Sequence, residues 1–169
     1  MATTLTARVA LSLAAQLDKG LDVGSASYPA TLGITNVFEN GTGANQANEL
    51  FTDTRTLTAS ATENLDLAGV LTDAFGTVLS FTKVKAIIVT AAAANTNDVV
   101  VGGHATAAFA PMFGDVTDTV VVKPGGTFVI VAPDATGYPV TATTADMLTV
   151  TNSAGGTSVT YTIAIVGTV

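Results

Sequence analysis

The chain has 169 residues, a formal net charge of -7 and no cysteine. This length fits one domain that buries a core without cross-links, and the lack of cysteine excludes disulfides, thiolate nucleophiles and cysteine-ligated zinc. Only six Lys and Arg residues are scattered along the chain, which argues against nucleic acid as a partner because phosphate backbones attract basic clusters.

Charged residues make up 11% of the chain, well below the roughly 25% of ordinary globular domains. So sparse a charged surface favours a molecule whose neutral area is covered by other subunits. A membrane is not the expected cover, since the longest apolar run, Ala86 to Ala94, contains a Thr and falls well short of the roughly 20 residues of a spanning helix.

The N-terminal segment carries apolar residues at a spacing of four. Leu5, Val9, Leu13 and Leu17 recur in this way before Gly20, which predicts a short amphipathic helix or an extended docking arm. The connector that follows, GLDVGSASYPA, is rich in Gly and Ser and is typical of a linker. We therefore expect an arm and linker over residues 1–30 and a single domain over residues 31–169.

The domain itself has the pattern of a β-protein. TLGITNVFE predicts a first strand, ENGTGANQAN an exposed loop, and the alternation from Phe51 to Thr62 a strand with a row of Thr on one face. Short apolar runs separated by turn residues follow at roughly ten-residue spacing. This pattern predicts an all-β fold, an antiparallel β-sandwich or jelly-roll-like barrel.

One stretch, TVVVKPGGTFVIVAP from Thr119 to Pro133, does not alternate. It is predicted to form a hairpin that is apolar on both faces, although a solvated hairpin normally has one polar face. We interpret the second face as a contact with other subunits. The predicted oligomer or capsid interface comprises Val121, Val129 and Val131 of this stretch with Leu5, Val9 and Leu13 of the arm.

Catalytic and metal-binding signals are weak. The only histidine, His104, follows two glycines without a G-x-S-x-G motif, so a structural role is expected for it. Asp115 and Asp118 form a short acidic segment that fits either a calcium site or an ordinary capped turn. The paired glycines do not match a nucleotide-binding motif. We expect a protein that is not an enzyme and holds no cofactor or metal.

Three segments carry a resemblance to a known class of protein: GANQANELFTDTRTLTASATENLDLAG, VKAIIVTAAAANTNDVVVGG and VVVKPGGTFVIVAPDATGYPV. Over about Gly43 to Val166 the chain resembles small β-rich virion proteins of tailed bacteriophages, and it is most similar to capsid decoration, or cement, proteins. The resemblance implies a homotrimer on the outer surface of the capsid that bridges copies of the major capsid protein.

Two alternatives remain open. One is a tail, spike or connector component of the virion, and the other is a carbohydrate-binding or adhesive β-sandwich module.

Overall fold

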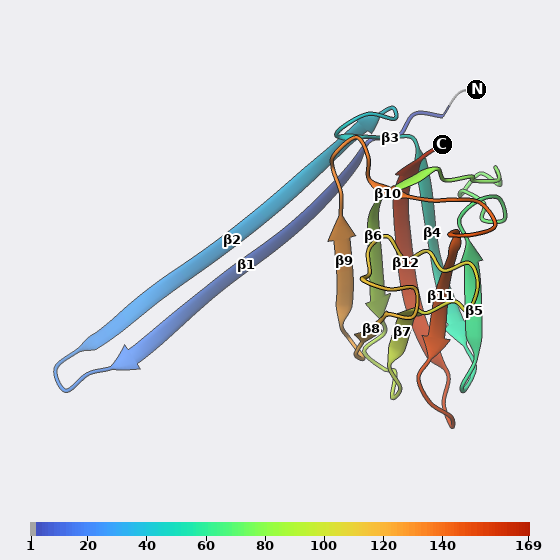
Figure 1. Ribbon diagram of the computed structural model, residues 1–169. Coiled ribbons are helices and arrows are strands. Elements are labelled where there is room, and N and C mark those ends of the chain that lie inside the picture. The colour runs from blue at the N-terminus through green and yellow to red at the C-terminus, as the bar shows by residue number, and fades with distance from the viewer. Residues whose placement is uncertain (1–2) are drawn as a thin grey trace.

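A computed structural model describes residues 3–169, which form twelve strands and no helix (Figure 1). The strands build two facing sheets and a long N-terminal hairpin that projects away from them. Their bounds are β1 Ala7–Gly20, β2 Ser25–Asn40, β3 Gln46–Ala47, β4 Glu49–Leu57, β5 Thr62–Asp66, β6 Lys83–Ala91, β7 Val99–Gly102, β8 Thr119–Val122, β9 Thr127–Val131, β10 Tyr138–Pro139, β11 Met147–Asn152 and β12 Val159–Thr168.

The two sheets are antiparallel. The first has the order β10-β6-β12-β4, with β9 also paired to β6, and the second has the order β5-β11-β7-β8. The predicted all-β antiparallel sandwich is thereby confirmed.

The core lies between the sheets because apolar side chains occupy every second position of the central strands, on the face that points toward the other sheet. In β12, Val159, Tyr161, Ile163 and Ile165 are fully buried and point into this core, while Thr162 on the opposite face is exposed. We call the face of the first sheet that points away from the core the outer face.

The Thr row predicted from residue 52 onward lies on this outer face, where Thr54 is 2.9 Å from Thr162 between hydroxyl oxygens. The predicted strand is shorter than expected, since β4 ends at Leu57. A turn at Ser60, which has a φ of 56°, then leads into β5 of the other sheet.

The predicted hairpin from Thr119 to Pro133 is wrong. β8 pairs with β7 in the second sheet and β9 pairs with β6 in the first, so the turn between them crosses from one sheet to the other. Gly125 in this turn has a φ of 74°, a left-handed conformation that favours glycine. Each strand therefore turns one face toward the core from its own sheet. On β9 the side chains that pack against the core are Phe128 and Ile130.

Of the two alternatives expected for the N-terminal segment, an amphipathic helix or an extended docking arm, the helix is not formed, because β1 pairs along its whole length with β2 as an extended antiparallel hairpin. A spacing of four residues places side chains on one face of a helix, but it also places them on one face of a strand. Leu11, two residues after Val9, is in phase only with the strand. The Gly and Ser rich linker expected at residues 20–30 is a turn followed by the start of β2, and the hairpin extends to Asn40 beyond the expected boundary at residue 30.

We call residues 11–34 of this hairpin the arm, and the part that contacts the sandwich the root. A strand rises about 3.3 Å per residue, so the arm extends about 30 Å past the root. It leaves the sandwich near β9 and diverges from it (Figure 1).

Candidate functional site

The arm is amphipathic, and its strand register shows how. Residues opposite one another in an antiparallel pair share a face, and Leu11 lies opposite Ile34, Leu13 opposite Leu32 and Leu17 opposite Tyr28. These six residues, with Ala15 and Ala30 between them, form the apolar face. The polar face carries small and polar residues: Ala10, Ser12, Ala14, Gln16, Asp18, Ser27, Pro29, Thr31, Gly33 and Thr35.

The large side chains of the apolar face lie in water. Leu13 is 56% exposed, Leu17 71% and Tyr28 67%. Single exposed apolar residues are ordinary on protein surfaces, but a continuous stripe marks an interaction site. A two-stranded hairpin without further packing is also marginally stable in water. The arm therefore has the properties of an element that a partner completes.

The root shows what kind of surface suits this face. Val9 and Phe38 continue the apolar face toward the sandwich, and both are buried against Ala86 and Val166 on the outer face of the first sheet. Leu5, Ile88, Val129 and Val131 pack around this contact and remain partly exposed.

A groove of about 280 Å³ opens beside the root. Leu11 and Ile34 line it on the side of the arm, and Val129, Val131 and Pro133 line it on the side of the sandwich.

Backbone hydrogen bonds fix the direction in which the arm leaves the sandwich. The Glu39 N–H donates to the Asn45 carbonyl at 2.9 Å, and the Asn45 N–H donates to the Pro133 carbonyl at 2.7 Å. Asn40 accepts a hydrogen bond from the Leu5 N–H at 3.1 Å through its side-chain oxygen. The root is thus attached to the loop after β9 as well as to the sheet.

Lys85 connects the same two segments from within. Its side chain is fully buried, and its Nζ donates to the carbonyls of Gly43, at 3.3 Å, and Asp134. Burial lowers the pKa of Lys85, while the nearby Asp134 carboxylate opposes part of this effect. The hydrogen bonds that the Asp134 carboxylate accepts from the N–H groups of Gly137 and Thr136 lower its own pKa. The loop from Glu39 to Asn48, expected to be exposed, is therefore partly buried as the root of the arm.

The predicted interface residues fall into three places. Leu5, Val9, Val129 and Val131 come together at the root, where the chain's own hairpin covers part of the β9 valines. Leu13 lies farther out on the arm. Val121 lies on β8 at the edge of the second sheet, where it is 50% exposed, and it does not join the others. The outward face of β9 is thus partly covered within one chain.

Sequence reasoning did not identify four of the arm residues as part of an apolar surface. These are Leu11, Tyr28, Leu32 and Ile34. The sequence signal for this face is the alternation of large apolar residues from Val9 to Leu17, which Ala14 and Ala15 interrupt because they are alike but lie on opposite faces. The apolar residues of β2 are seen to share this face only from the strand register.

The other candidate residues have structural partners. His104 accepts hydrogen bonds through Nδ1 from the N–H groups of Ala107, at 2.9 Å, and Thr106, at 3.3 Å. Asp118 accepts a bond from the Asp115 N–H at 2.8 Å, and Asp115 accepts bonds from the N–H and hydroxyl of Thr117. The two hydrogen bonds from Thr117 lower the pKa of Asp115. Both carboxylates thus cap a turn, and within residues 3–169 no three His, Cys, Asp or Glu residues are grouped as a metal site.

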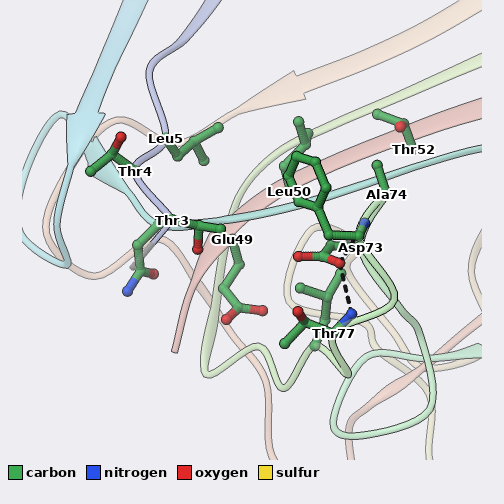
Figure 2. A pocket seen from close by; sticks show the side chains of 12 residues that line it. Thr3, Thr4, Leu5, Glu49, Leu50, Thr52, Asp73, Ala74 and Thr77 are labelled. Atoms are coloured by element: carbon green, nitrogen blue, oxygen red, sulfur yellow. Dashed lines mark hydrogen bonds between the residues drawn. The ribbon is translucent and has the colours of Figure 1, made fainter. Parts of the chain in front are cut away.

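A second cavity of about 160 Å³ lies between the N-terminal segment and the loop after β5 (Figure 2). Glu49 and Asp73 flank it, and burial together with the Asp73 charge raises the pKa of Glu49 against a hydrogen bond from the Ser80 backbone. Asp73 is engaged by the Thr77 N–H at 2.8 Å (Figure 2). The volume of this second cavity is below the roughly 300 to 1,000 Å³ of ligand pockets. We assign the arm and its root as the candidate functional site on the exposed apolar face of the arm, not on the volume of a cavity.

Comparison of the chain with protein families, curated proteins and solved structures finds no match. Among the described residues there is no helix with the length and apolarity needed to cross a membrane.

Proposed function

We propose that this protein is a non-enzymatic structural protein of a bacteriophage virion, a capsid decoration protein that assembles as a homotrimer and bridges copies of the major capsid protein on the outer surface of the head. The observation that carries an assembly role is the projecting arm with its exposed apolar face. The virion setting is supported by the resemblance of the sequence from Gly43 to Val166 to such proteins.

Bridging requires a second contact surface besides the arm, and the loop between β5 and β6 offers one. Phe75 is 83% exposed at the tip of a turn, and Val70 and Val78 of the same loop are also exposed. The Asp73 carboxylate accepts hydrogen bonds from the N–H groups of Phe75 and Thr77, each at 2.8 Å, and so orders the turn. This loop lies on the side of the sandwich away from the arm (Figure 1). We assign it as the contact with the capsid protein.

The test is to locate the full-length protein on particles of the phage that encodes it. Electron microscopy of heads incubated with the purified protein should show added density at regular positions on their outer surface. Phe75→Ser should weaken head binding by at least about tenfold while leaving self-association unchanged, because aromatic anchors dominate interface affinity. Binding to purified tails instead of heads would favour a tail component, and binding to neither would contradict the proposal.

A further inference from the structure

We propose that the apolar face of the arm of one subunit lies on the outer face of the first sheet of a second subunit, over β9, β6 and β12. This inference specifies the self-association within the proposed function, and it holds or fails independently of the capsid. Every copy carries both contact surfaces, the arm and the sheet.

The root provides the first argument, because it already makes this contact within one chain. Val9 and Phe38 belong to the same hairpin face as Leu11 and Leu13, and they are buried on Ala86 and Val166 of the outer face. The arm beyond the root continues with the same pattern of large apolar side chains. The outer face of a neighbouring subunit therefore presents to the arm the same kind of surface on which the root is buried in its own chain.

The outer face next to the root is suited to accept such an arm. Val129, Ile88 and Ala164 lie side by side across β9, β6 and β12 and are only partly buried, and the next row consists of Thr127, Thr90 and Thr162. β9 and β12 contain no charged residue, so an apolar partner desolvates no charge on them. β9 is moreover an edge strand without Lys or Pro, a type of edge that proteins normally protect.

A second copy fits better than the chain's own sheet. The groove between Leu11 and Val129 shows that the arm has already separated from β9 at that level, and the arm diverges further toward its tip (Figure 1). Leu13, Leu17 and Tyr28 therefore lie beyond the reach of their own outer face.

The area agrees with this choice of partner. Six large side chains of the apolar face, each about half to two-thirds exposed, present on the order of 600 Å². A stable interface needs about 800 Å² from each partner. One arm thus supplies most of one side of such an interface. The arm and the sheet are different surfaces, so the contact is compatible with copies related by rotation in a closed ring, as a homotrimer requires.

Cross-linking of cysteine variants tests this contact directly, because the natural chain has no cysteine. Full-length Leu13→Cys and Thr162→Cys proteins are mixed and treated with a short bismaleimide. The mixture should yield a heterodimer, which arises only between two chains. Ala14→Cys, on the polar face of the arm, and Thr62→Cys, on the second sheet, serve as matched controls and should give little product.

Two results would overturn the inference. One is a mixture that cross-links no faster than the controls, which would also be the result if the arm folded back on its own sheet. The other is Leu13→Cys alone forming homodimers faster than the mixture forms heterodimers, which would indicate contact between two arms.

Charge substitution provides an independent measurement by sedimentation. Leu11→Asp combined with Leu13→Asp should weaken self-association at least about tenfold, because the interface would bury unpaired carboxylates. Ser12→Asp with Ala14→Asp adds the same charge to the polar face and should change self-association by less than about twofold. Equal effects of the two pairs would contradict the assignment of the faces. Heads that bind neither wild type nor variants would leave this contact intact and reject only the capsid role.

Discussion

At the scale of single residues, Tyr161 shows how a buried polar group is paired in the core. The ring is fully buried, and its hydroxyl donates to Glu63 at 2.6 Å. The Glu63 carboxylate also forms an ion pair with Arg55, with 2.7 Å between Oε2 and Nη1, and the Arg55 guanidinium lies over the Phe51 ring. These groups close the side of the sandwich between β4 and β5. Burial, followed by the hydrogen bond to Glu63, raises the pKa of Tyr161 far above its ordinary value.

This raised pKa predicts a loss of stability in alkaline solution. The folded chain keeps the Tyr161 proton above pH 10, whereas the unfolded chain releases it, so the stabilisation is complete below about pH 10 and decreases above it by about 1.4 kcal/mol per pH unit. Tyr161→Phe removes this titration. Denaturant unfolding of both proteins from pH 8 upward should show that the wild type loses its advantage above about pH 10. A constant difference between the two would contradict the prediction.

Lys85 is the second buried polar residue with a testable role. Replacing it with Met leaves the partly buried carbonyl of Gly43 without its donor, which should lower the free energy of unfolding by about 1 to 3 kcal/mol. Lys83, which contacts the Ala135 carbonyl at 3.0 Å in a more exposed position, is the matched control. Lys83→Met should change stability by less than about 0.5 kcal/mol. Equal losses in urea titrations would show that burial of Lys85 is unimportant.

At the scale of elements, the hairpin has two parts with opposite environments. The root is buried and hydrogen-bonded to the loops after β2 and β9, whereas the arm contributes nothing to the core of the sandwich. Because strand pairing alone barely stabilises a hairpin, most of the folding energy of the chain resides in the sandwich. The arm is therefore an appendage whose removal the domain should tolerate.

Excision of the arm tests this division. Leu11 and Ile34 face each other, so replacing residues 12–33 with Asn-Gly closes a short hairpin by a favoured turn. The melting temperature of the monomer should change by less than about 4 °C, because the excised residues bury little apolar surface within the chain. Self-association should be lost.

A smaller excision gives the control. Replacing residues 18–27 between Leu17 and Tyr28 removes the tip and keeps the apolar face, and it should retain self-association. A sandwich that fails to fold without residues 12–33 would contradict the division.

At the scale of the whole molecule, low charge and a large apolar extension belong together. The net charge of -7 keeps the monomers soluble, but 11% charged residues leave little to shield the arm. The proposed association of subunits would cover the arm. Partners that bind only the folded state also stabilise that state by mass action.

The melting temperature of the wild type should therefore rise with protein concentration. Calorimetry over a hundredfold range should show this rise, and the protein without residues 12–33 should melt at one temperature throughout, because it lacks the arm that we propose links the subunits. A wild-type melting temperature independent of concentration would argue that the subunits do not associate in solution.

The class of fold was accessible from local pattern. The alternation of Val159, Tyr161, Ile163 and Ile165, and the Thr row of β4, depend only on a period of two and on turn residues between the runs. The capped turn at Asp115 was likewise one of the two interpretations of its spacing. These features reflect interactions between near neighbours, which a sequence displays directly.

Other features required the tertiary structure. Val9, Leu13 and Leu17 fit helix and strand equally, and the pairing of β1 with β2 decides for the strand. The partners of β8 and β9 are β7 and β6, from different parts of the chain, so the sequence could not show that one apolar stretch serves two sheets. The sequence by itself determined an all-β sandwich with excess apolar surface. The tertiary structure decided where that excess lies, because burial depends on contacts between residues far apart along the chain.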